Sequence, residues 1–104
     1  MDQLIRVAAL DEIREHCGTL VRVNGEDVTI FKLDGKLFAI SNVCAHQHFS
    51  MLHKGEIIGS SVTCPMHGWS YDIRTGKATS GDGMVATYIV KTKGNDVFIE
   101  IPTQ

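Results

Sequence analysis

Two short stretches of the sequence each combine one cysteine with one histidine. In the first stretch Cys44 is followed by His46, and in the second Cys64 is followed by His67. Thiolate sulfur and imidazole nitrogen are common ligands of transition metals. Gly68 directly follows the second stretch, and glycine suits a tight loop. If each stretch occupies a loop tip, the four side chains can converge on one centre, so the spacing predicts a metal site.

The segments on either side of these stretches alternate apolar and polar residues, as β strands do. Asn24-Gly25 and Asp34-Gly35 separate three such runs near the N-terminus. Both dipeptides favour two-residue hairpin turns, because their residues tolerate positive φ. A further hairpin is expected at 93–96, and a short helical turn at 10–15. The predicted strands, which indicate a small antiparallel sandwich or barrel, cover 19–23, 26–33, 36–40, 85–91 and 97–101.

The residues in and after the cysteine–histidine pairs read Cys44-x-His46, then Cys64-Pro65-x-His67-Gly68-Trp69-x-Tyr71-Asp72, then Thr75-Gly76. This pattern resembles the Rieske iron–sulfur family, and the resemblance extends over essentially the whole chain. It implies an all-β fold, a Rieske-type antiparallel β-sandwich with an inserted cluster-binding subdomain. We expect a single domain over residues 1–104, with its basal part at 1–42 and 77–104 and its cluster-binding part at 43–76.

The resemblance implies one [2Fe–2S] cluster, with Cys44 and Cys64 on one iron and His46 and His67 on the other. Two ferric ions, two sulfides and two thiolates sum to about zero charge, whereas four thiolates would give about −2. A site of lower negative charge accepts an electron more readily, so we expect a one-electron carrier. The residues expected beside the cluster are Gly68, Trp69 and Tyr71, the last with its hydroxyl bonded to the sulfur of Cys64.

Three positions differ from the pattern of respiratory Rieske proteins. Phe49 and Met66 stand where those proteins carry an additional pair of cysteines joined as a disulfide. Trp69 stands where they carry a serine. These differences indicate similarity to the soluble ferredoxins and oxygenase domains of the family. They also indicate a lower reduction potential than that of the respiratory Rieske proteins.

The resemblance implies a carrier that passes electrons from a flavin-dependent reductase to a terminal oxygenase and is not itself an enzyme. We expect a monomer that docks transiently through a rim of Gln47, Phe49 and Met66. One alternative is the small subunit of an NAD(P)H-dependent nitrite reductase, which has the same fold and size. Another is a zinc-stabilised binding module, because tetrahedral zinc accepts two thiolates and two imidazoles.

Length and charge exclude several classes of protein. The chain has 104 residues, 43% of them hydrophobic, which suits one domain. Ten Lys and Arg against twelve Asp and Glu give a formal charge of −2, so nucleic acid is not an expected partner. No apolar run approaches the roughly 18–20 residues of a membrane span. The N-terminus lacks a signal-peptide pattern, and we expect a cytoplasmic protein.

The remaining cysteine and histidines have no assigned chemistry. Three cysteines are a poor count for a disulfide scaffold, and Cys17 is expected to be a small packing residue. His48 and His53 are expected to be solvated residues of the first loop.

Overall fold

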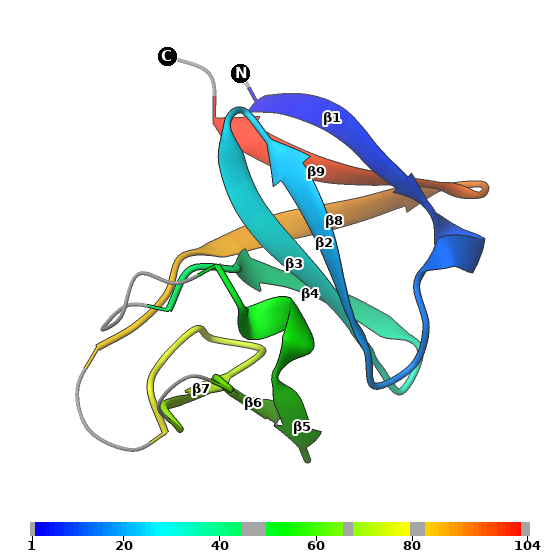
Figure 1. The fold of residues 1–104 in the computed structure, drawn as a ribbon. Helices are drawn as coiled ribbons and strands as arrows, with labels where there is room; N and C mark the ends of the chain where they lie inside the picture. The colour runs from blue at the N-terminus through cyan, green and yellow to red at the C-terminus, as the bar shows by residue number, and fades with distance from the viewer. Residues whose placement is uncertain (1, 45–49, 66–67, 80–82, 103–104) are drawn as a thin grey trace.

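A six-stranded antiparallel sheet forms the larger part of the computed structural model, which describes residues 2–44, 50–65, 68–79 and 83–102 (Figure 1). The strand order is β1-β9-β8-β4-β3-β2, and β1 also contacts β2, so the sheet curls until its two edges approach each other. A 3-10 helix, η1, spans Leu10–Glu12. The strands are β1 (Asp2–Ala9), β2 (Gly18–Val23), β3 (Glu26–Leu33), β4 (Lys36–Ser41), β8 (Thr87–Lys93) and β9 (Asp96–Pro102).

A second, three-stranded sheet lies below the first in Figure 1. Its order is β5-β6-β7, and all its pairings are antiparallel. A second 3-10 helix, η2 (Leu52–Lys54), precedes it. In the described part of the chain, no helix is long and apolar enough to cross a membrane. The strands are β5 (Glu56–Ile58), β6 (Ser61–Thr63) and β7 (Ser70–Asp72).

The predicted hairpin turns are confirmed. Asn24 and Gly25 have φ of 54° and 82°, and Asp34 and Gly35 have φ of 51° and 80°. Positive φ at both central residues is the type I′ geometry, whose twist matches that of the flanking strands. The two turns therefore set the registers of β2 with β3 and of β3 with β4, which run without interruption.

The sequence did not predict β1 or the small sheet, and the helical turn is shorter than expected. Strand β1 pairs with β9 at the opposite end of the chain, and its register shifts between Arg6 and Ala8. This bulge interrupts the alternation of apolar residues that would identify a strand. The strands of the small sheet have only three residues each, too few for a periodic signal.

The two faces of β3 contribute to two separate hydrophobic cores. Val28 and Ile30 point into the core of the curled sheet, where Val97 and Ile99 of β9 also lie. Phe31, on the opposite face of β3, belongs to a core shared with the small sheet. Side chains of successive residues alternate between the faces of a strand, so β3 joins the two cores. The second core also contains Leu33, Ile40, Cys44, Leu52, Val62, Cys64, Tyr71, Ile73 and Val85.

Candidate metal centre

The two cysteines of the predicted metal site enter the same core. Cys44 follows β4 and Cys64 directly follows β6, and their exposed fractions are 0% and 1%. Neither cysteine forms a disulfide. The fold therefore brings together two buried thiols that are far apart in the sequence.

The loop after Cys64 is closed by backbone hydrogen bonds. The Cys64 N–H donates to the Trp69 carbonyl at 2.7 Å, and the Gly68 N–H donates to the Cys64 carbonyl at 3.1 Å. Gly68 has a φ of 76°, in the left-handed region that favours glycine. At the base of the loop, the Thr63 and Ser70 hydroxyls lie 2.7 Å apart. These bonds hold Cys64 at the start of a tight turn.

Two aromatic residues predicted to lie beside the site are part of its surroundings. Trp69 is partly buried and packs against the core that contains both cysteines. Tyr71 is fully buried, and its hydroxyl oxygen lies 3.2 Å from Sγ of Cys44. The hydroxyl lies beside the sulfur of a predicted ligand, as the sequence predicted, but that sulfur belongs to Cys44 and not to Cys64. Tyr71 pairs with Val62 in the small sheet, and its ring crosses the core from there toward the first loop.

The loop that begins at Cys44 is also closed at its base. Val43 and Ser50 form an antiparallel bridge. The backbone N–H groups of Met51 and Leu52 both donate to the Asn42 carbonyl, each at 3.1 Å. The Asn42 N–H donates to the Asp27 carbonyl at 2.9 Å, which ties the loop to β3.

Several predicted site residues lie outside the described residues. These are the two histidine ligands, the three residues of the predicted docking rim and one further histidine: His46, His67, Gln47, Phe49, Met66 and His48. In the described ranges, no group of three or more His, Cys, Asp or Glu is placed to hold a metal ion. The four-ligand set is therefore still a prediction.

Two sequence predictions outside the ligand set are wrong. Cys17 is exposed and is not a packing residue. It follows His16, which has a φ of 56°, in the turn that leads into β2. His53 is partly buried in η2, where its ring and its backbone both contact the side chain of Asn42. Burial and the nearby Lys54 lower the pKa of His53, which favours its neutral form.

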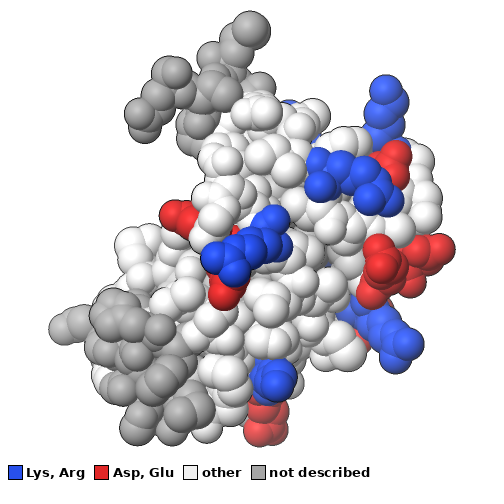
Figure 2. All heavy atoms as spheres, turned by 45° about the horizontal axis from the view of Figure 1, so that its top comes forward, with Lys and Arg blue, Asp and Glu red and all other residues white. Residues whose placement is uncertain are grey.

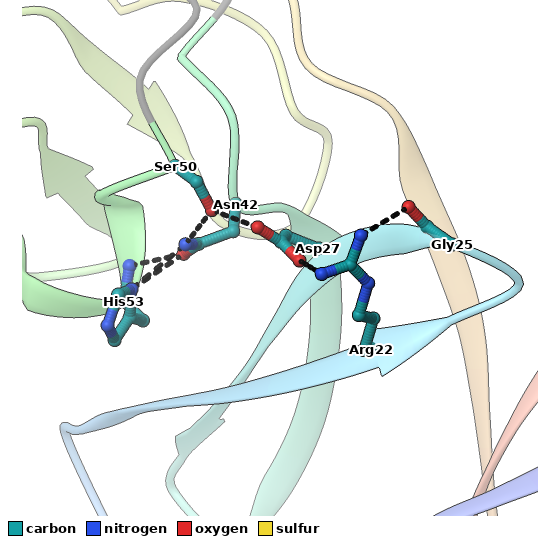
Figure 3. Close-up of polar contacts among 6 residues, drawn as sticks. All are labelled: Arg22, Gly25, Asp27, Asn42, Ser50 and His53. Atoms are coloured by element: carbon teal, nitrogen blue, oxygen red, sulfur yellow. Dashed lines mark hydrogen bonds and ion pairs between the residues drawn. The ribbon is translucent and has the colours of Figure 1, made fainter.

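The polar group around Asn42 was not found from the sequence. Asn42 is fully buried, and its side chain contacts Ser50 and His53 (Figure 3). Ser50 in turn donates to Asp27 at 2.6 Å. A polar residue shortly after a predicted strand is common in ordinary loops, so only the burial of Asn42 distinguishes it.

Known proteins of similar sequence are ferredoxin components of dioxygenase systems. The chain is 32% identical over 99 residues to the ferredoxin component of the naphthalene 1,2-dioxygenase/salicylate 5-hydroxylase systems of a Ralstonia species. That match covers 93% of this chain and 94% of the relative. The ferredoxin of carbazole 1,9a-dioxygenase from Nocardioides aromaticivorans IC177 superposes with a TM-score of 0.86 at 30% identity, covering 93% of this chain and 96% of that one.

The fold also occurs in a second group of proteins. The putative NADH-dependent nitrite reductase small subunit from Mycobacterium tuberculosis superposes with a TM-score of 0.91, covering 100% of this chain and 99% of that one. Its identity to this chain is 17%, so the likeness shows a shared fold alone. The model of the Rieske [2Fe-2S] domain matches residues 3–93, which is most of the chain. The chain therefore belongs to the Rieske [2Fe-2S] domain family, whose cofactor is a Rieske-type [2Fe–2S] cluster.

Proposed function

We propose that this protein carries single electrons from a flavin-dependent reductase to a terminal oxygenase. The observation that carries the proposal is the match to a ferredoxin component along nearly the full length of both chains. The chemistry that the bound cluster supplies is the uptake and release of one electron. In such a system the reductase and the oxygenase supply the other activities, so the carrier is not itself an enzyme.

The ligand assignment is part of this proposal. Cys44 and Cys64 would hold one iron, and His46 and His67 the other. Two buried thiols that share one core without a disulfide suit thiolate ligation. A hydroxyl beside one sulfur suits a site whose negative charge increases on reduction.

The division of the domain is a second part of the proposal. We assign the basal part to 1–42 and 77–104, and the cluster-binding part to 43–76. The presence of two separate cores supports this division, because the two cysteines lie in the core that the small sheet shares with β3.

The partners follow from the relatives. One solved structure similar to this chain at 27% identity is the reduced complex between oxygenase and ferredoxin in carbazole 1,9a-dioxygenase, where the match covers 93% of this chain and 28% of the matched chain. Figure 2 shows Lys and Arg interspersed with Asp and Glu on the face it displays, with no large area of one sign. Weak electron-transfer encounters bury small interfaces, which suits a docking rim of a few residues. We propose that a monomer docks through Gln47, Phe49 and Met66, and that it works in the cytoplasm, where cysteines remain reduced.

The test combines spectroscopy with electron transfer. The purified protein should show the visible absorbance of an oxidised Rieske cluster, which bleaches on reduction. It should then be reduced by a flavin-dependent reductase of an aromatic-ring dioxygenase system and reoxidised by the matching oxygenase. Electron transfer that occurs only with a sirohaem nitrite reductase would overturn the proposal in favour of the nitrite reductase alternative. A colourless, zinc-containing native protein would contradict both.

A further inference from the structure

A chain of hydrogen bonds closes the base of the loop that begins at Cys44 (Figure 3). The amide Nδ2 of Asn42 donates to the Ser50 hydroxyl at 2.8 Å, and that hydroxyl donates to Oδ2 of Asp27 at 2.6 Å. An amide nitrogen only donates and an ionised carboxylate only accepts, so the chain runs in one direction. Consecutive hydrogen bonds polarise one another, which strengthens each of them.

The same asparagine also holds His53, the middle residue of η2. Oδ1 of Asn42 accepts a hydrogen bond from the His53 backbone N–H at 2.5 Å, and Nδ2 lies 2.9 Å from Nδ1 of His53. Both polar atoms of this fully buried side chain therefore have partners. A buried amide that lost them would cost free energy, so the native arrangement is strongly favoured.

The partners of Asn42 are themselves held by the curled sheet. Asp27 lies in β3, and its Oδ1 is 3.9 Å from Nη1 of Arg22 in β2. On the other side, a Cβ added to Gly18 of β2 would lie only 2.7 Å from the His53 carbonyl oxygen. Backbone therefore packs on backbone at this point, and the loop ends are fixed relative to β2 and β3.

Cys44 lies close in sequence to this group of contacts. Cys44 is two residues after Asn42, whereas its partner Tyr71 lies in β7 of the small sheet. The 3.2 Å contact between Cys44 Sγ and the Tyr71 hydroxyl therefore joins parts held by different sheets. A hydrogen bond weakens steeply as its geometry departs from the optimum. A small shift of the loop start would therefore weaken it.

We propose that Asn42 is a positioning residue: through Ser50, Asp27 and His53 it holds the sulfur of Cys44 at hydrogen-bonding distance from the Tyr71 hydroxyl. The inference rests on the proposed function, because it takes Cys44 as a ligand of the cluster. A hydroxyl donated to this sulfur stabilises the reduced state more than the oxidised state. Asn42 therefore helps to set the midpoint potential without contacting the cluster.

The test is a double-mutant cycle on the cluster-loaded protein, read by voltammetry at one pH. Asn42→Ala should lower the midpoint potential in the protein that retains Tyr71. In the Tyr71→Phe background, Asn42→Ala should cause no further shift, because the bond it acts through is already gone. The shift from Asn42→Ala should not exceed that from Tyr71→Phe.

A second pair of variants keeps the test decisive if Asn42→Ala does not fold. Ser50→Ala removes one link of the chain at a partly buried position and should lower the potential in the same way. Ser50→Thr keeps the hydroxyl and should restore the wild-type value. Ser61→Ala removes an exposed hydrogen bond of 3.0 Å to the Ile58 carbonyl, in the turn between β5 and β6, and should leave the potential unchanged.

The outcomes separate the inference from the proposed function. A wild-type protein without a Rieske spectrum would overturn the proposed function itself. A normal wild-type spectrum, with equal potentials in wild type, Asn42→Ala and Ser50→Ala, would overturn the inference alone. Equal shifts with and without the Tyr71 hydroxyl would also overturn it, because the effect would then not pass through that bond.

Discussion

The hydroxyl of Tyr71 lies 3.2 Å from Sγ of Cys44, although the two residues are 27 positions apart in the sequence. Both side chains are fully buried. A hydroxyl so placed can donate to a thiolate, and such a bond is stronger when the thiolate carries more negative charge. We therefore expect Tyr71, a residue of the small sheet, to influence the midpoint potential of the predicted metal site.

Tyr71→Phe should lower the midpoint potential and leave the cluster in place. The change removes the hydroxyl and keeps the ring, so packing is little affected. If the lost bond favours the reduced state by about 0.5–1.5 kcal/mol, the potential should fall by roughly 20–65 mV for a one-electron couple. Voltammetry of both proteins at one pH measures the difference. An unchanged or raised potential with an intact spectrum would mean that Tyr71 acts only through packing.

His67→Ala should abolish the intact cluster. In the proposed ligand set the variant removes one of the two protein ligands of the outer iron, and the loops lose a crosslink that stabilises the fold. The visible spectrum and the iron content of the purified variant report the loss. His16→Asn is the matched control, since it removes an exposed histidine that is not a proposed ligand, tolerates the positive φ at this position, and should retain the cluster. A normal Rieske spectrum in His67→Ala would contradict the ligand assignment.

Local signals in the sequence predicted the parts of the fold that depend on neighbouring residues. The turns at Asn24-Gly25 and Asp34-Gly35 were correct because the conformations of these residues determine the turn type. The spacing of the two cysteines is a local pattern that predicted a shared site, and the structure brings both into one core; their binding of a metal stays a prediction. Strand β1 was missed because it forms through pairing with β9 at the far end of the chain.

The contacts that position the site were not predictable either, because they also join residues that are far apart in the sequence. Asn42, Ser50 and Asp27 come from separate segments, and each has an ordinary polar side chain. Their connection exists only once β3 and the first loop are folded together. The expected partner of Tyr71 was also wrong because the direction of its ring across the core is set by packing, not by sequence distance.

His53 should make the stability of the protein depend on pH below its ordinary pKa of 6.5. Burial, followed by the charge of Lys54, lowers its pKa in the folded state. The unfolded state therefore binds more protons than the folded state in this range, so stability is fully present above pH 6.5 and falls as the pH falls. The neutral ring can also accept the Asn42 amide at Nδ1, which protonation would prevent.

The measurement compares His53→Gln with wild type. The thermal midpoints of the two proteins should be recorded at pH 7.5 and at several values below 6.5. Wild type should lose more stability than the variant as the pH falls, because the other titratable groups are common to both. Parallel curves over this range would show that His53 does not contribute.

Gly18→Ala should destabilise the protein by forcing β2 away from η2. An added Cβ would lie 2.7 Å from the His53 carbonyl oxygen and 2.9 Å from Oγ1 of Thr29, which is fully buried. The backbone of His53 cannot move freely because it is bonded to Asn42. Thr29 cannot move freely because it is packed inside the protein. Overpacking of a core by one methyl group costs about 1–3 kcal/mol.

The expected result is a lower thermal midpoint together with faster bleaching, measured here as the loss over time of the visible absorbance of the oxidised cluster. The bleaching follows because the displaced helix η2 carries the end of the Cys44 loop with it. Leu20→Ala, on the same strand at a position 44% exposed, is the control and should bleach at the wild-type rate. If Gly18→Ala lowers the midpoint but bleaches no faster than Leu20→Ala, the contact stabilises the fold without holding the loop. If it changes neither, β2 and η2 are not in the close contact that the structure shows.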